Sequence, residues 1–179
     1  MTSVTSDSIL YTFRRAGALL DGHFRLSSGL HSPGYLQCAL VLQHPREAEA
    51  LGAAIAARVG ATSADVVLSP ALGVRAIFAE RQDGVLTLRR GFALRPGERV
   101  LVVEDVVTTG GSTRETIEVA RAAGATVVAA AAIIDRSGGN QGLDVPFYAL
   151  APMSVPAYQP DSCPLCAQGI PVTKPGSRA

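Results

Sequence analysis

The chain has 179 residues, of which 47% are hydrophobic and 17% charged, so it can bury the core of one domain of ordinary size. Its formal net charge of +1 gives no general attraction for nucleic acid or anionic membranes, and neither is expected as a partner. No apolar run is long enough to span a membrane, and the polar segment Met1–Ser8 does not resemble a secretory signal. With three cysteines and no disulfide framework, the chain is expected in the cytoplasm.

Helix and strand patterns alternate along the chain. The first helix could be capped by Ser6 or Asp7, and the first strands are broken by turns at Ser28–Gly29 and Pro33–Gly34. In chain order the expected elements are a helix over Ser6–Leu19, short strands over Phe24–Val41, a helix over Pro45–Val59, strands over Asp65–Leu68, Val74–Phe78 and Arg99–Val103, a helix over Ser112–Ala123, strands over Thr126–Ile134 and Pro146–Leu150, and an irregular stretch over Pro152–Ala179. This order predicts an α/β fold with a central parallel sheet, in a single domain.

One connection is too short for a parallel sheet. Only Ser69–Gly73 separates the strands expected over Asp65–Leu68 and Val74–Phe78, whereas a parallel crossover needs about a dozen residues. Either the two strands pair antiparallel, or a helix near Gly73 is missing from the sequence. We favour the missing helix, which predicts a chain break near Gly73, visible as a Cα–Cα step far above about 3.8 Å.

The segment Val100–Thr113 carries the strongest chemical signal in the sequence. Four apolar residues predict a strand buried on both faces, followed by Glu104 and Asp105 at its carboxyl end, where open α/β sheets bind ligands. Carboxylates suit sugar hydroxyls or a hydrated metal ion. Thr108–Ser112 then leads into a helix, and its glycines, hydroxyls and helix N-terminus can hold a phosphate. These residues predict a ribose 5-phosphate site; the alternative is a structural strand–turn–helix with incidental polarity.

Two other phosphate-binding motifs are absent from the sequence. There is no Gly-x-x-x-x-Gly-Lys-Ser/Thr, and the single lysine, Lys174, lies far from the segment Val100–Thr113. There is also no Gly-x-Gly-x-x-Gly. The phosphate site predicted here is therefore of a different type.

Val100–Thr113 resembles the phosphoribosyl pyrophosphate motif of type I phosphoribosyltransferases, with an apolar strand, an acidic pair, a short apolar spacer and Thr-Gly-Gly-Ser. The resemblance implies that family's fold, a central parallel sheet flanked by helices with a small N-terminal hood, here about residues 1–40 plus the C-terminal stretch. It implies Asp105, Glu104 and Arg81 as catalytic residues. The residues implied to bind phosphoribosyl pyrophosphate are Glu104, Asp105, Val106, Val107, Thr108, Thr109, Gly110, Gly111, Ser112, Arg81, Arg89 and Arg90.

Two weaker matches concern the base. Phe24–Gln37 resembles the N-terminal segment of orotate phosphoribosyltransferases, and Ile134-Asp135-Arg136 resembles their Asp-Arg after a late strand. The resemblance implies that Arg136 contacts the carboxylate of orotate, which a guanidinium pairs well with. The alternative is a surface ion pair between Arg136 and Asp135. The residues implied to bind orotate are Arg136, Thr108, Phe24 and Tyr35.

The pyrophosphate end departs from the family's pattern. Ser69–Gly73 resembles the start of the pyrophosphate loop but is cut short, and Ser27 stands where the family has a lysine. Phe78–Arg81 resembles the strand before the mobile catalytic loop. That loop, Arg81–Gly91, carries only arginines where the family has lysines and a histidine. The arginines could contact pyrophosphate or be solvated loop charges.

The resemblance implies an enzyme, a pentosyltransferase that forms orotidine 5′-monophosphate and pyrophosphate from orotate and phosphoribosyl pyrophosphate in pyrimidine (UMP) biosynthesis. It implies Mg²⁺ as cofactor, held mainly by the substrate, so no residue is assigned as a metal ligand. It also implies a homodimer in which the mobile loop reaches the partner's site. The alternatives are a phosphoribosyltransferase for a purine or another base, and a non-catalytic nucleotide-sensing regulator on the same fold.

The cysteines and histidines receive no chemical role from the sequence. Cys163-x-x-Cys166 has no second cysteine pair and no suitable histidine nearby in the sequence, so a zinc site within one chain is not favoured. A structural role is preferred, and a site shared across a dimer or a redox-labile pair stays open. None of His23, His31 and His44 is assigned to proton transfer.

Overall fold

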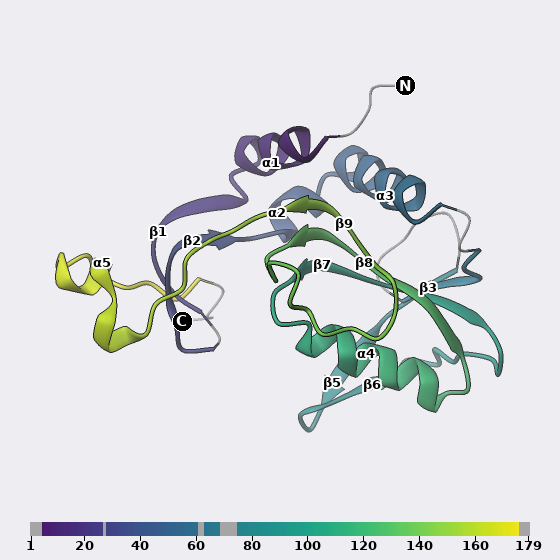
Figure 1. Ribbon diagram of the computed structural model, residues 1–179. Coiled ribbons are helices and arrows are strands. Elements are labelled where there is room, and N and C mark those ends of the chain that lie inside the picture. The colour runs from purple at the N-terminus through teal and green to yellow at the C-terminus, as the bar shows by residue number, and fades with distance from the viewer. Residues whose placement is uncertain (1–4, 27, 61–62, 69–74, 176–179) are drawn as a thin grey trace.

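The computed structural model describes residues 5–26, 28–60, 63–68 and 75–175. The elements in these ranges are shown in Figure 1. In chain order they are α1 (Ser6–Arg15), β1 (Leu19–Arg25), β2 (His31–Leu36), α2 (Ala39–Leu42), α3 (Pro45–Val59), β3 (Val66–Leu68), β4 (Arg75–Ile77), β5 (Ala79–Gln82), β6 (Val85–Leu88), β7 (Arg99–Val107), α4 (Gly111–Ala122), β8 (Thr126–Asp135), β9 (Phe147–Pro152), η2 (Pro160–Ser162) and α5 (Pro164–Ala167).

A parallel sheet forms the centre of the molecule. Within the described ranges it has five strands in the order β4-β3-β7-β8-β9, and all neighbouring pairs are parallel. Helices α1 and α3 cover one face and α4 covers the other (Figure 1). The predicted α/β class and central parallel sheet are thus confirmed. None of the helices in the described part of the chain has the length and apolar character needed to cross a membrane.

Strand β7 shows why the sheet needs cover on both faces. Leu101 and Val103 belong to the apolar cluster under α1 and α3, whereas Val100 and Val102 belong to the cluster under α4. Side chains alternate between the two faces of a strand, so an unbroken apolar run requires two apolar layers. The polar residues at the end of β7 then leave this buried environment, which places the site at the edge of the sheet.

The hood is a separate antiparallel hairpin of β1 and β2. The C-terminal segment, yellow in Figure 1, lies beside it and is joined to it by backbone bridges. Phe24 pairs with Thr173 and His31 pairs with Tyr158. Residues from the two ends of the chain therefore build one unit next to the sheet.

The first helix is shorter than expected. It ends at Arg15, its N-cap is Thr5 rather than Ser6 or Asp7, and Leu19 already begins β1. The Thr5 hydroxyl accepts a hydrogen bond from the Ser8 backbone N–H at 3.3 Å. Gly17, with φ of +66°, ends the helical conformation, since most other residues disfavour positive φ.

Several other boundaries also differ from expectation. The turn expected at Pro33–Gly34 is wrong, because both residues lie inside β2. The hairpin β5–β6 occupies most of the expected loop, with positive φ at Asp83 and Gly84 in its turn. Strand β7 extends to Val107, so the acidic pair lies within the strand rather than after it. The short helices α2, η2 and α5 were not expected, whereas α3 over Pro45–Val59 is confirmed.

Strands β3 and β4 pair parallel, so the antiparallel alternative is wrong. Val66 pairs with Arg75 and Val67 with Ala76. Only residues 69–74 connect these two parallel strands in the sequence. The expected chain break near Gly73, the start of the pyrophosphate loop and Ser27 lie outside the described residues.

Candidate active site

The residues predicted for the ribose phosphate lie at the carboxyl end of β7, and Arg136, predicted for the base, follows the carboxyl end of the adjacent strand β8. In the register of the sheet, Val107 at the end of β7 pairs with Asp135 at the end of β8. The Arg136 backbone N–H donates to the Val107 carbonyl at 2.8 Å, so β8 stays attached to β7 up to the start of the phosphate loop. The structure therefore brings Arg136 beside Thr108, although the two are far apart in the sequence.

The two acids of β7 have different environments because they point to opposite sides of the strand. Asp105 is exposed, and its Oδ1 accepts the Val106 backbone N–H at 2.8 Å. Glu104 is half-buried and accepts the Ser112 hydroxyl at 3.3 Å. Burial, and then the negative charge of Asp105, raise the pKa of Glu104, while the Ser112 hydrogen bond opposes the shift. A ligand that donates hydrogen bonds would relieve this cost.

The loop before α4 has the shape of an anion cradle. Gly110 is the N-cap of α4 in the left-handed conformation, with φ of +72°. A Cβ at this position would lie 2.2 Å from the Gln141 carbonyl oxygen, so only glycine fits. The N–H groups of the first helical turn, which begins at Gly111, have no acceptors within the helix. They are available to an anion together with the exposed hydroxyls of Thr108 and Thr109.

Arg114 braces this loop and was not identified from the sequence. Its Nη1 donates to the Thr109 carbonyl at 2.9 Å and to the Gln141 carbonyl at 2.6 Å. The guanidinium therefore ties the loop before α4 to the segment that follows β8. In the sequence, only its position directly after Val100–Thr113 indicates that Arg114 belongs to the site.

No hydrogen bond or ion pair of the Arg136 guanidinium is seen among the described residues. Arg136 is half-buried, and burial lowers the pKa of its side chain. The ion pair expected as the alternative is not found among the described residues, and the Asp135 carboxylate instead accepts the Ser137 backbone N–H at 2.8 Å. A partly desolvated guanidinium without a carboxylate partner favours an anionic ligand.

Cys38 is a second residue at the site that the sequence did not indicate. It is buried at the start of α2, and burial followed by the negative charge of Asp105 raises the pKa of its thiol. The thiol therefore stays protonated and can act only as a weak donor toward Asp105. The hood-side helix α2 is thus connected to the acidic pair.

The three loop arginines point to carboxylates of the same chain or lie exposed. Arg81 pairs with Glu115 of α4 at 2.7 Å, and Arg90 pairs with Glu80 at 2.8 Å. Arg89 is exposed. The structure therefore does not bring these arginines together with the acidic pair. In Figure 1 the β5–β6 hairpin lies alongside α4.

The two aromatic residues predicted for the base lie in the hood. Phe24 is buried and Tyr35 is half-buried, and their ring centroids are 5.8 Å apart. Phe24 is in β1 and Tyr35 in β2. The two rings lie together on the β1–β2 hairpin, whereas Arg136 follows β8 of the five-stranded sheet.

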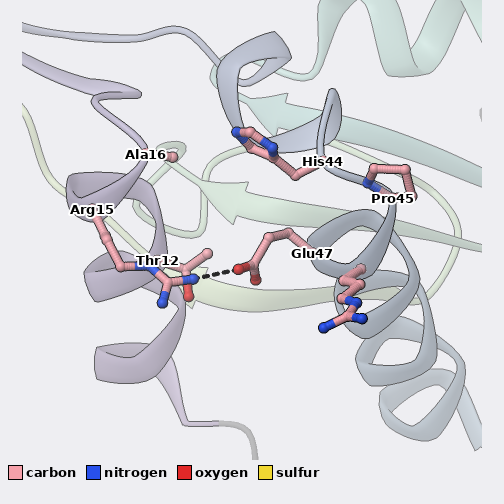
Figure 2. A pocket seen from close by; sticks show the side chains of 7 residues that line it. Thr12, Arg15, Ala16, His44, Pro45 and Glu47 are labelled. Carbon is pink, nitrogen blue, oxygen red and sulfur yellow. Dashed lines mark hydrogen bonds and ion pairs between the residues drawn. The ribbon is translucent and has the colours of Figure 1, made fainter.

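A pocket of about 540 Å³ lies elsewhere, between α1 and the start of α3. Figure 2 shows Arg15 of α1 paired with Glu47 of α3 across it. Thr12 and His44 also contribute to its wall. None of the residues predicted to bind substrate lines this pocket, so its size does not make it the candidate active site.

The chain is similar to curated orotate phosphoribosyltransferases over nearly its whole length. It is 52% identical to the enzyme of Pelotomaculum thermopropionicum over 188 aligned positions, covering 98% of this chain and 99% of the relative. It is 53% identical to the enzyme of Heliobacterium modesticaldum over 190 positions, covering 98% of this chain and 100% of that protein. Both alignments are longer than this chain of 179 residues, so both relatives have residues without a counterpart here.

The family model of the phosphoribosyl transferase domain matches residues 45–150. The structure is also similar to the crystal structure of orotate phosphoribosyltransferase from Aeropyrum pernix, with a TM-score of 0.66, 25% identity, and coverage of 81% of this chain and 93% of that chain. The type I phosphoribosyltransferase fold expected from the motif is confirmed. Because the relatives match from end to end at about half identity, the chain belongs to the orotate phosphoribosyltransferase family.

Proposed function

We propose that this enzyme transfers the phosphoribosyl group of phosphoribosyl pyrophosphate to orotate at the carboxyl ends of β7 and β8. The observation that carries the proposal is the adjacency of the acidic pair Glu104–Asp105, the anion cradle before α4 and the guanidinium of Arg136. The names of the relatives support orotate as the base. A purine base has no carboxylate for Arg136, and the relatives' names support an enzyme rather than a non-catalytic regulator.

The reaction is a substitution at the anomeric carbon of the ribose. The bond from this carbon to the pyrophosphate oxygen breaks, and pyrophosphate leaves with the electron pair. A ring nitrogen of orotate forms the new carbon–nitrogen bond and its proton is released. The transition state gathers positive charge on the ribose, so the protein contributes by positioning and by electrostatic stabilisation. Glu104 and Asp105 would accept hydrogen bonds from the ribose hydroxyls, and Thr108–Ser112 would hold the 5-phosphate.

The donor set at this edge also suits Mg²⁺. This ion prefers oxygen ligands and keeps several waters, and the acidic pair supplies carboxylate oxygens beside the anion cradle. The exposed Asp105 carboxylate is the residue that would approach it most readily, with the remaining oxygens provided by the substrate. When bound, Mg²⁺ would stabilise negative charge on the leaving pyrophosphate.

We further propose that Arg81, Arg89 and Arg90 contact pyrophosphate when the β5–β6 hairpin moves over the site. Support comes from the exposed ion pair that holds Arg81, because such pairs are weak and exchange readily with a polyanion. A closed hairpin would also exclude water from the activated ribose. A cytoplasmic homodimer is proposed from the family resemblance, and a solution mass of twice the chain mass would support it.

The test is the loss of orotate ultraviolet absorbance in the presence of phosphoribosyl pyrophosphate and Mg²⁺. Turnover that requires all components, and that Asp105→Asn reduces strongly, is expected. Arg136→Ala should raise the KM for orotate by about 10- to 100-fold, because a charged hydrogen-bonded pair is lost, with a much smaller change for phosphoribosyl pyrophosphate.

Matched controls separate these effects from general damage. Asp161→Asn and Arg58→Ala remove the same groups at exposed positions outside the proposed site, and both should leave turnover unchanged. If folded protein consumes adenine or xanthine but not orotate, the assignment of the base is wrong. If Arg136→Ala affects both substrates equally, the role given to this guanidinium is wrong.

A further inference from the structure

Four metal-binding side chains that the proposed reaction does not use lie together in the hood. His23 is in β1 and His31 in β2, whereas Cys163 and Cys166 belong to the region of the short helix α5. One ligand atom from each lies within 4.8 Å of all the others. We propose that these four side chains bind a structural zinc ion, in a site that goes beyond the transferase reaction.

The distances between the ligand atoms match a tetrahedral zinc site. With bonds of about 2.3 Å to sulfur and about 2.0–2.1 Å to nitrogen, tetrahedral geometry separates two nitrogens by about 3.3 Å and nitrogen from sulfur by about 3.5 Å. His23 Nε2 lies 3.0 Å from His31 Nδ1. Cys163 Sγ lies 3.5 Å from His23 Nε2, and Cys166 Sγ lies 3.8 Å from His23 Nε2 and 3.3 Å from His31 Nδ1. Shifts of a few tenths of an ångström would complete the geometry.

A hydrogen bond on the far side of the ring orients His23 as a ligand. Its Nδ1 lies 2.7 Å from the Ile170 carbonyl oxygen, which can only accept. Nδ1 therefore carries a proton, and Nε2, which lies 3.0–3.8 Å from the other three ligand atoms, is the nitrogen that can bind a metal. Such a carbonyl partner on the far ring nitrogen is the usual arrangement around a metal-bound histidine.

The environment suits zinc better than other divalent ions. Two thiolates neutralise the charge of the ion, and a set of two sulfurs and two nitrogens in tetrahedral arrangement is typical of structural zinc. His23, His31 and Cys163 are buried, with 2%, 7% and 3% of their surfaces exposed, so they are held in place. Cys166 is exposed and gives the ion a path into the site.

The proposed ion would fasten the C-terminal segment to the hood. The Thr173 backbone N–H donates to the His23 carbonyl and the Arg25 N–H donates to the Thr173 carbonyl, both at 2.8 Å. The backbone bonds between His31 and Tyr158 add to these. The segment nevertheless has little apolar burial, because α5 and its surroundings are mostly exposed. Phe24, one of the aromatic residues proposed for the base pocket, follows His23 directly, so the ion would also steady that wall.

Metal content and metal uptake test the proposal. Full-length protein purified without chelators should contain one zinc ion per chain, as measured by inductively coupled plasma mass spectrometry. Reduced apoprotein titrated with Co²⁺ should develop the intense visible bands of tetrahedral cobalt and a thiolate charge-transfer band in the near ultraviolet. Zn²⁺ should abolish both, and a zinc chelator should lower the melting temperature of the native protein. These readouts do not depend on orotate turnover, so they stand or fall apart from the proposed function.

The chain provides a matched control for each ligand type. Cys166→Ser and His31→Gln should weaken zinc binding by at least about tenfold. Substitution of residues that only hydrogen-bond to metal ligands already lowers metal affinity by this factor. Cys38→Ala and His44→Gln change the remaining cysteine and histidine and should keep the full zinc content. Because Cys166 is exposed, its substitution leaves a folded protein in which the loss can be measured.

Three results would overturn the proposal. The first is reduced, folded protein that contains no zinc and takes up neither Zn²⁺ nor Co²⁺, which would leave a hydrogen-bonded His–Cys cluster. The second is a Cys163–Cys166 disulfide that persists under mild reduction. The third is an equal loss of metal from the control variants.

Discussion

Glu104 carries an electrostatic cost in the protein without substrate. Burial and the adjacent Asp105 raise the pKa of its carboxyl above the ordinary value of 4.5. The folded chain therefore binds this proton more tightly than the unfolded chain. Stability from this group is complete below pH 4.5 and is lost as the pH rises through the folded-state pKa. Near neutral pH the ionised side chain therefore destabilises the fold. A role in binding the ribose would explain why a carboxylate is present at this position.

This cost predicts opposite effects of Glu104→Gln on stability and activity. The amide can still accept from the Ser112 hydroxyl, but it carries no charge to desolvate. We expect a higher melting temperature than native at pH 7, no difference below pH 4.5, and turnover reduced by at least about tenfold, as for removal of one electrostatic group from a transition state. Thermal unfolding at the two pH values, together with the orotate assay, measures all three.

The control for this change is Glu49→Gln, which removes an exposed carboxylate from α3. It should alter neither the pH dependence of stability nor turnover. A melting temperature for Glu104→Gln below that of the native protein at pH 7 would show that the carboxylate stabilises the free enzyme, against the direction of its pKa shift.

At the scale of elements, the β5–β6 hairpin couples to α4 through the ion pair of Arg81 and Glu115. Both partners are about half exposed, so the pair contributes little to stability. If Arg81 must leave Glu115 to reach pyrophosphate, the carboxylate competes with the substrate. The competing carboxylate of Glu80 acts on Arg90 in the same way.

Glu115→Gln is therefore expected to lower the KM for phosphoribosyl pyrophosphate. The change should be less than about fivefold, because an exposed pair contributes under about 1 kcal/mol. The KM for orotate should stay the same. Steady-state kinetics at low ionic strength, where surface charges are least screened, give the largest effect.

Glu118→Gln is the matched control, because Glu118 lies three residues further along α4 and pairs with Arg121 instead. It should not change either KM. An unchanged or higher KM for phosphoribosyl pyrophosphate in Glu115→Gln would mean that Arg81 stays with α4 during the reaction, and the proposed role of the hairpin arginines would fail.

At the scale of the whole molecule, the connection between β3 and β4 is the irregular feature. The strands are parallel, yet residues 69–74 alone connect them, where about a dozen or more residues are usual. The relatives also have residues that this chain lacks. We propose that these additional residues include a crossover helix between the equivalents of Leu68 and Arg75.

Insertion of that segment from the Pelotomaculum enzyme should stabilise this chain. A crossover helix would cover the sheet next to β3 and complete the pyrophosphate side of the site. We expect a melting temperature higher by several degrees, since about 1 kcal/mol shifts it by about 2–4 °C at this chain length, and a lower KM for phosphoribosyl pyrophosphate. A segment of equal length and polar Gly/Ser composition is the control. Equal or lower stability with the natural segment would contradict the proposal.

The sequence by itself determined the features that are local. The helix Pro45–Val59 follows from its proline start and alanine-rich run, and Val100–Thr113 follows from a strand, loop and helix that are contiguous. Because each of these signals lies within one continuous stretch of sequence, composition and spacing are enough to predict them. The α/β class was predictable from the alternation of helix and strand patterns, and the position of the acidic pair near the carboxyl end of its strand from the residue order alone.

Tertiary structure decided the features that join distant segments. The register of β7 and β8 places Arg136 beside the phosphate loop, and parallel pairing relates β3 to β4 despite their short connection. Folding also brings the histidines of the hood to Cys163-x-x-Cys166, which had no histidine partner in its own stretch of sequence. Such contacts depend on how the core packs and on which strands become neighbours. Neither is encoded in the spacing of residues along the chain.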